Sequence, residues 1–159
     1  MTKPVLYEHF GSKQELYRSL VEREATRLAQ AVLARFDGGE PLEARLRTLA
    51  AEAVGFAREH PDSARLLLQL PLGDAGVMTA HERARGQAHR LIAAAILEDP
   101  LFRPSPGLSK EASATLLAEL QTAVLERLVA WAIEHPEIGG DHLAEVFVDV
   151  LWKGLSETD

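Results

Sequence analysis

Helical periodicity runs along almost the entire chain of 159 residues, and this feature restricts the possible folds more than any other. Apolar residues return at spacings of three or four, and no stretch shows the alternation of a half-buried strand. Breaks rich in Gly, Pro and Asp divide the pattern. The sequence therefore predicts an all-α fold with about seven helices, which cover residues 2–9, 13–36, 41–59, 62–70, 75–97, 109–135 and 142–155.

Several helix boundaries have chemical signatures. Gly11 suits the left-handed residue after a helix, and Ser12 with Glu15 three residues later suits an N-cap. Pro41 and Pro61 suit the first position of a helix. Ser109 is expected to cap the helix that follows the loop at 99–108, which is rich in Pro.

The triplet Glu-His-Pro occurs twice, at residues 59–61 and 134–136. Each His is expected near a helix C-terminus, where a cation is favourable. Metal binding is the less favoured interpretation, because no other ligand type gathers nearby in the sequence.

The first 17 residues carry a dense set of hydrogen-bond donors on a short helix and on the start of the next one. Tyr, Lys and Thr side chains and helix N-termini are the usual phosphate contacts of a DNA-binding helix. The donors in this stretch are Thr2, Lys3, Tyr7, His9 and Lys13.

The same stretch closely resembles the recognition helix and the following helix start of the TetR family of bacterial transcriptional regulators. The matching positions are Thr2-Lys3-Pro4, Leu6-Tyr7, His9-Phe10, Ser12-Lys13 and Leu16-Tyr17. The resemblance implies that residues 2–9 enter the major groove of operator DNA. It implies base contacts by Thr2, Pro4 and Val5, and backbone contacts by Lys3, Tyr7, His9 and Lys13.

The resemblance also implies two domains, a helix-turn-helix remnant at 1–22 and an effector-binding and dimerisation domain at 23–159. TetR-like proteins carry two helices before the recognition helix, whereas this chain starts at Met1. We therefore expect an N-terminally truncated, ligand-responsive regulator, a repressor, whose present form binds DNA weakly and without sequence preference. The alternative is a small-molecule-binding homodimer with no DNA-binding role.

Charge and composition restrict the other function classes. The net charge is −7, but residues 1–23 carry +1 and the remainder −8, so only the first segment suits DNA. The chain has no Cys, no Gly-x-Ser-x-Gly elbow and no Gly-rich phosphate loop. His81-Glu82 lacks the second His of a zinc helix, because position 85 is Arg85. We predict no enzyme activity, no cofactor and no metal, and, without a membrane span or signal peptide, a cytoplasmic protein.

The last two predicted helices are apolar on more than one stripe. A helix that is apolar around much of its circumference is buried on two sides, and in a chain of this size the second side is expected to be another chain. The resemblance implies a four-helix bundle with the partner's copies, and an internal hairpin in a monomer is the alternative. The predicted interface residues are Leu125, Val129, Val148, Leu151, Trp152 and Leu155.

A small-molecule effector is also implied by the resemblance, and it requires an apolar cavity with a few polar groups. His81, Arg85 and His89 occur at i, i+4 and i+8 and share one helix face. That face could meet an acidic ligand or form a solvated stripe, and the solvated stripe is the preferred interpretation. The candidate ligand-binding residues are Phe56, Leu67, Met78, His81, Arg85, His89, Gln121 and Trp131. The sequence does not specify the effector, the operator or the direction of regulation.

Overall fold

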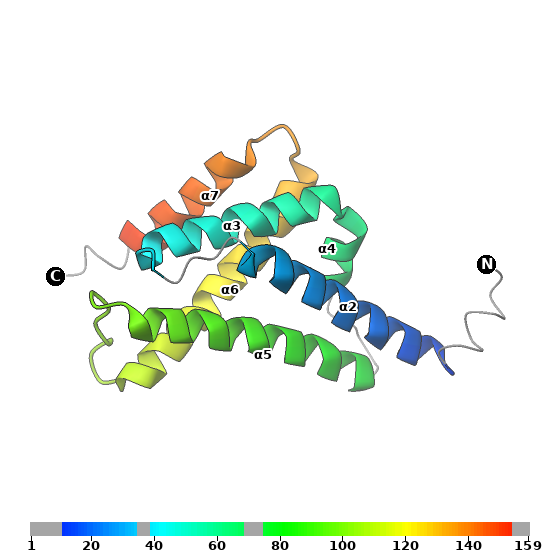
Figure 1. Ribbon diagram of the computed structural model, residues 1–159, viewed down its shortest axis with the longest axis horizontal. Helices are drawn as coiled ribbons and strands as arrows, with labels where there is room; N and C mark the ends of the chain where they lie inside the picture. The colour runs from blue at the N-terminus through cyan, green and yellow to red at the C-terminus, as the bar shows by residue number, and fades with distance from the viewer. Residues whose placement is uncertain (1–10, 35–38, 69–74, 154–159) are drawn as a thin grey trace.

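The computed structural model describes residues 11–34, 39–68 and 75–153, and all regular structure in these ranges is helical. The predicted all-α fold is confirmed, while the first expected helix, residues 2–9, lies outside the described residues. The elements are α2 (Lys13–Leu33), α3 (Leu42–Glu59), α4 (Pro61–Leu68), α5 (Ala75–Glu98), α6 (Lys110–Glu134), α7 (Gly140–Val148) and the π-helical turn η1 (Asp149–Lys153) (Figure 1).

Two predicted helix starts are formed by serine caps, whereas Pro41, predicted at the first helical position, is the N-cap of α3. Gly11 has a φ of 64°, and the Ser12 hydroxyl accepts a hydrogen bond from the backbone N–H of Glu15 at 3.1 Å. The Ser109 hydroxyl caps α6 in the same way, accepting from Ala112 N–H at 3.1 Å. Both serines satisfy a backbone donor that the first turn of a helix leaves unpaired.

The two Glu-His-Pro triplets end helices, as the sequence indicates. His60 is the C-cap of α3 and His135 the C-cap of α6, and α4 begins at Pro61. The last helix differs from the prediction. It begins at Gly140, is α-helical only to Val148, and continues as η1.

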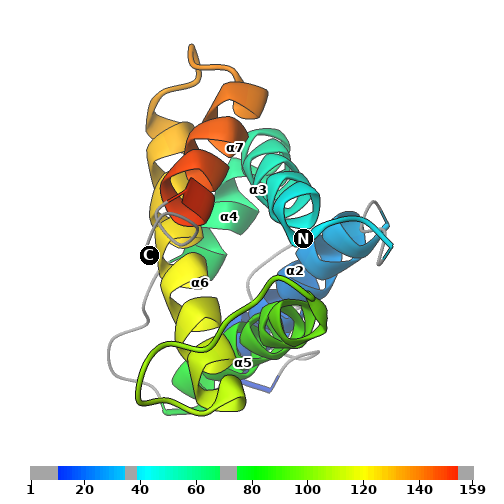
Figure 2. The same ribbon diagram turned by 90° about the vertical axis from the view of Figure 1, so that its left-hand side faces the viewer.

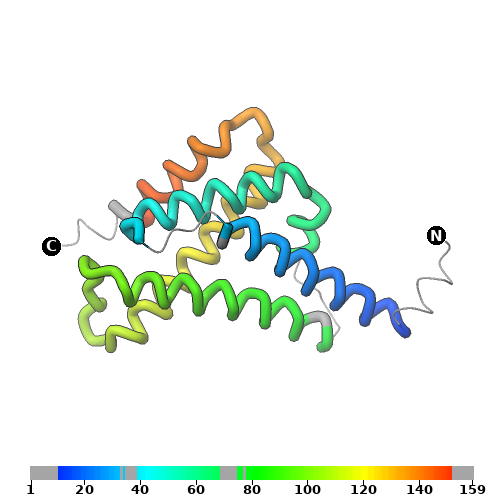
Figure 3. Tube along the Cα trace, in the orientation of Figure 1, coloured from blue at the N-terminus to red at the C-terminus, as the bar shows by residue number. Residues whose placement is uncertain are grey.

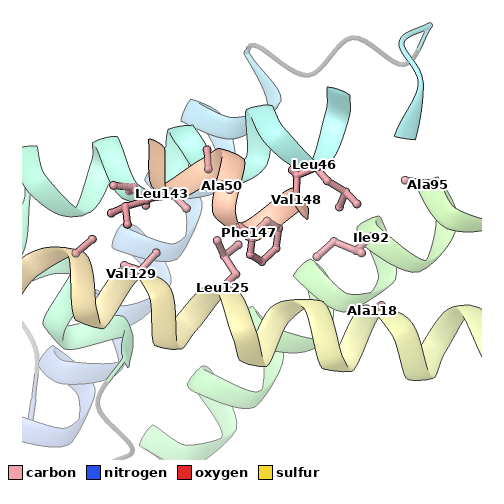
Figure 4. Close-up of a cluster of buried hydrophobic side chains, with 14 of the residues drawn as sticks. Leu46, Ala50, Ile92, Ala95, Ala118, Leu125, Val129, Leu143, Phe147 and Val148 are labelled. Atoms are coloured by element: carbon pink, nitrogen blue, oxygen red, sulfur yellow. The ribbon is translucent and has the colours of Figure 1, made fainter. Parts of the chain in front are cut away.

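The hydrophobic core lies between α3, α6 and α7, and the end of α5 adds Ile92, Ala95 and Ile96 to it (Figure 4). One face of α3 is buried at i, i+4 and i+8 by Leu42, Leu46 and Ala50. Phe147 and Val148 of α7, which are 2% and 1% exposed, fill the space opposite. Small residues on α6, such as Ala118, allow the helices to approach closely.

Packing pairs arrange the helices around this core. α7 lies along α3, and α5 lies along both α2 and α6 (Figures 1 and 2). The tube in Figure 3 follows α6 as it crosses obliquely between the α3–α7 pair and α5. Arg58 of α3 donates a hydrogen bond to the carbonyl oxygen of Ile138, which ties α3 to the turn before α7. No helix among the described residues is long and apolar enough to cross a membrane.

The burial pattern corrects the predicted dimer interface. Leu125, Val129 and Val148 belong to the core of the chain itself, and Leu151 is half-buried against that core. The assignment of Leu125, Val129 and Val148 to an interface with a second chain is therefore wrong. These three residues form the inner stripe of α6 and α7, the buried side that belongs to the same cluster as Leu143, Phe147 and the apolar face of α3. The side chain of Trp152 and the whole of Leu155 lie outside the described residues.

Candidate functional site

Four helices form a closed ring of packing contacts. α2 packs against α4 and α5, and α6 packs against α4 and α5 (Figure 2). The polar cluster that we consider as the candidate site lies on three of these helices, and consists of Glu24 from α2, His81, Arg85 and His89 from α5, and Gln121 from α6. All five side chains contain a buried nitrogen or oxygen atom with no hydrogen-bond partner.

His81 begins the row of α5 side chains and contacts two other helices. Its ring lies 6.1 Å from the ring of Tyr17 on α2, measured between centroids. Burial lowers the pKa of His81, and a hydrogen bond with the backbone of Leu67 on α4 partly offsets this effect. The imidazole is therefore neutral at pH 7, donating to Leu67 through one nitrogen, while its Nε2 has no partner.

Arg85 and His89 face acidic side chains of α6. Arg85 Nε lies 2.9 Å from Oε1 of Glu126, and His89 Nδ1 lies 3.3 Å from Oε1 of Glu119. The distance between Arg85 Nε and Glu126 Oε1 is short, but the N–H does not form a hydrogen bond. The two side chains are therefore held together by the attraction of their charges. These two contacts join α5 to α6 in an antiparallel order, and Gln121 lies between Glu119 and Glu126 along α6.

Gln121 is the most buried polar residue of the cluster. Its side chain is 2% exposed, and its Oε1 has no hydrogen-bond partner. Buried polar groups are nearly always paired, and each unpaired one costs about 1–3 kcal/mol of stability. Since a folded chain rarely retains several such costs, these unpaired groups make the facing sides of α2, α5 and α6 a candidate for a binding site.

Glu24 brings a carboxylate to the same ring of helices. Glu24 is 3% exposed, and its Oε1 lies 2.7 Å from Nη2 of Arg23. Burial raises the pKa of Glu24, but hydrogen bonds from Ser63 and Arg23 and the charges of Arg23 and Arg27 outweigh it, so the pKa lies below its usual value. Ser63 is one turn before Leu67 on α4, so the neighbours of Glu24 and His81 share one face of that helix.

Four of the eight predicted ligand-binding residues belong to the polar cluster. His81, Arg85, His89 and Gln121 are in the cluster, and Leu67 contributes its backbone. The preferred interpretation of the α5 face as a solvated stripe is wrong, because the face packs against α6 and α2.

The other predicted residues have different surroundings. Met78 is 45% exposed at the start of α5. The Phe56 ring meets His60 edge-on at 5.2 Å, and Trp131 stacks on His135 at 4.0 Å, so both aromatic rings support helix ends. Tyr17 and Glu24 are not among the residues predicted from the sequence to bind a ligand. The burial of Glu24 could have been predicted, because it lies four residues from both Leu20 and Leu28, within the apolar stripe of α2.

Of the predicted DNA-binding residues, only Lys13 can be located. It is exposed in the first turn of α2. Thr2, Lys3, Pro4, Val5, Tyr7 and His9 lie outside the described residues. Within residues 11–34, 39–68 and 75–153, no group of three or more His, Asp or Glu side chains is arranged to hold a metal ion.

Comparison with solved structures identifies the fold. A TetR-like transcriptional regulator from Rhodococcus sp. RHA1 superposes with a TM-score of 0.77 and 25% sequence identity, covering 99% of this chain and 80% of that one. A protein of unknown function from Rhodococcus sp. RHA1 matches with a TM-score of 0.67 and 23% identity, covering 92% and 76%. No protein-family model and no curated protein matches the sequence.

Proposed function

We propose that this TetR-like chain is a ligand-responsive transcriptional regulator, a repressor, that acts on DNA as a homodimer. The observation that carries the proposal is the likeness to a TetR-like transcriptional regulator over 99% of the chain. The polar cluster supports an effector role for the body of the protein. Residues 1–22 are the proposed DNA-binding part, with residues 2–9 as the recognition helix, and residues 23–159 the effector-binding and dimerisation part.

The proposed dimer surface is an exposed apolar stripe on the last helices. On α6 the stripe contains Leu116, Leu120 and Val124, which are spaced by four and are 46%, 51% and 39% exposed. Because α7 returns alongside α6, Val146 and Val150 lie next to the C-terminal half of α6, and both are exposed. We name these five residues the outer stripe.

Several exposed apolar residues on neighbouring helices favour association with another chain. Obligate homodimer interfaces commonly bury more than about 2,000 Å² in total. The outer stripe is therefore the proposed dimer surface, in place of the inner stripe that the sequence predicts. The inner stripe holds the chain together, and the outer stripe remains for a second copy.

The proposal is tested first by the oligomeric state. Leu120→Glu places a charge in the middle of the outer stripe and should convert a dimer into a monomer in sedimentation equilibrium. Arg103→Glu, at an exposed loop position outside the stripe, is the control and should stay dimeric. A wild-type chain that remains monomeric at micromolar concentration would contradict the homodimer.

The regulatory role is tested in cells. Deleting the gene should change a small set of transcripts, which the wild-type gene restores and the Leu120→Glu gene does not. If the transcripts stay unchanged while the dimer and a ligand response persist, the protein is a small-molecule-binding homodimer without a DNA role.

Contact with DNA is tested at Lys13. Replacing Lys13 with Ala should weaken binding to all sequences alike and lower the salt slope by about one, as expected for a single phosphate contact. Gln14→Ala, at the next exposed position, is the matched control. Lys13→Ala binding that keeps the wild-type salt slope would remove this residue from the interface.

A further inference from the structure

A groove between α4 and α6 lies apart from the polar cluster. The two helices pack against each other, and the groove beside their contact has a volume of about 240 Å³. On α6 it begins more than two helical turns after Gln121. Its volume is below the range of about 300–1,000 Å³ of pockets for drug-sized ligands, so the groove suits one small molecule. The described residues that line it are Arg65 and Leu68 from α4, and Ala130, Ile133 and Glu134 from α6.

Three of these five lining residues are apolar. Leu68 and Ile133 are half-buried and pack against the hydrophobic core, which holds both side chains in place. Ala130 is also half-buried, and its methyl group leaves room that a larger side chain would fill. An apolar group of a ligand would therefore be removed from water by contact with these three residues.

The other two lining residues carry opposite charges, one on each helix. Arg65 lies in the last turn of α4, and its Nη1 is 3.4 Å from Oδ1 of Asp62. Both partners are exposed, so this ion pair contributes little, and the arginine fork retains donors for a carboxylate. Glu134 is the last residue of α6, where the carbonyl groups of the helix end add partial negative charge. A cation is therefore favoured at the α6 side of the groove.

We propose that this groove binds a small zwitterion, an α-amino acid with an apolar side chain. Its carboxylate lies on Arg65, its ammonium group lies at Glu134 and the C-terminus of α6, and its side chain covers Ala130. A simple acid or a simple amine of the same size satisfies only one of the two charges. The site goes beyond the regulator proposed above, since it depends neither on the polar cluster nor on DNA.

The proposal is tested with probes that differ in one charged group. The first series is leucine, 4-methylpentanoate and 3-methylbutylamine, and the second is phenylalanine, 3-phenylpropanoate and 2-phenylethylamine. Glycine serves as the zwitterion without an apolar side chain. Dissociation constants for the full chain are measured by isothermal titration calorimetry at pH 7. Leucine or phenylalanine should bind about tenfold more tightly than its matched acid, its matched amine and glycine.

Charge variants then assign each end of the ligand to a residue. In Arg65→Gln the amino acid should bind no more tightly than its matched amine, and in Glu134→Gln no more tightly than its matched acid. Both side chains are exposed, so both variants should fold. A loss of structure alone would weaken all probes together and would not move these two preferences separately.

A third variant tests the groove itself. Ala130→Leu fills the space and should weaken binding of the amino acid about tenfold, with the urea midpoint of unfolding close to that of the wild type. Arg83→Gln and Glu111→Gln, at exposed positions of α5 and α6 outside the groove, are the charge controls and should keep the wild-type affinities.

Three results would overturn the proposal. The first is that neither amino acid binds at millimolar concentration, and the second is that a matched acid or amine binds as tightly as its amino acid. The third is that Arg65→Gln and Glu134→Gln keep the wild-type order of probes. The dimer and transcript experiments use no probe, so this site and the proposed function can fail separately.

Discussion

The core between α3, α6 and α7 and the polar cluster between α2, α4, α5 and α6 are both buried, but they are built on opposite rules. The core is filled by Leu, Ile, Val, Ala and Phe side chains. The cluster contains five polar side chains, each with a buried atom that has no hydrogen-bond partner. α6 contributes to both regions, with Leu125 in the core and Gln121 in the cluster one turn earlier. The contrast teaches that core residues and unpaired polar residues follow one another along one face of the same helix.

The largest expected effect is on the core. Phe147→Ala removes a ring that is 2% exposed and leaves a cavity between α7 and α3. The free energy of unfolding should fall by about 3–5 kcal/mol, measured by urea denaturation. Phe102→Ala, at a half-buried position of the loop, is the comparison and should cost less. Equal losses would mean that the core is not the main source of stability.

The cluster should respond in the opposite direction. Gln121→Leu replaces an unpaired buried carbonyl with an apolar group of similar size, so the free energy of unfolding should stay level or rise by about 1 kcal/mol in the absence of ligand. Gln87→Leu, on the exposed side of α5, is the control and should change stability little. A loss of 2 kcal/mol or more in Gln121→Leu, about the cost of breaking a satisfied buried hydrogen bond, would show that Gln121 is a structural residue.

Helix caps sharpen the comparison at a smaller scale. Ser109→Ala removes the cap of α6, which both regions need, and should lower the free energy of unfolding by about 1 kcal/mol. Ser12→Ala removes the equivalent bond from α2, which belongs only to the cluster side. Its effect on global unfolding should be smaller, while hydrogen exchange in the first turn of α2 should accelerate. Identical global losses would show that α2 and α6 unfold as one unit.

The smallest expected effect is on the pH dependence of stability. Burial holds the pKa of His81 below its ordinary value of 6.5, so below about pH 7 the unfolded chain binds more protons than the folded one. Stability from the neutral imidazole is therefore fully present above pH 6.5 and is lost as the pH falls through the lowered pKa of the folded state. His81→Gln should flatten this part of the profile in urea titrations at pH 5, 6 and 7. A variant profile parallel to that of the wild type would contradict the assignment.

A good part of the fold could be predicted from the sequence, because local chemistry decides helices. Ser12, Ser109, Pro61 and the two His-Pro pairs mark boundaries through bonds to residues within one turn, and each boundary is where the sequence indicates. The α5 row of His81, Arg85 and His89 is equally a local property, since a spacing of four sets one face of a helix. The resemblance of residues 2–17 to TetR-like proteins also needs no tertiary information.

Only the tertiary structure decided which side of each helix faces the chain's own core. Periodicity reveals two apolar stripes on α6, but their roles depend on where α3 and α7 pack. The sequence alone therefore predicts an interface at Leu125 and Val129, whereas the structure places both in the core. The partners of His81, Arg85 and His89 could not be predicted from the sequence either. Glu119 and Glu126 are more than 25 residues away along the chain, and only the antiparallel packing of α5 and α6 places one carboxylate opposite Arg85 and the other opposite His89. Spacing along a helix is set by the backbone, whereas the partner of a face is set by long-range packing that no short stretch of sequence contains.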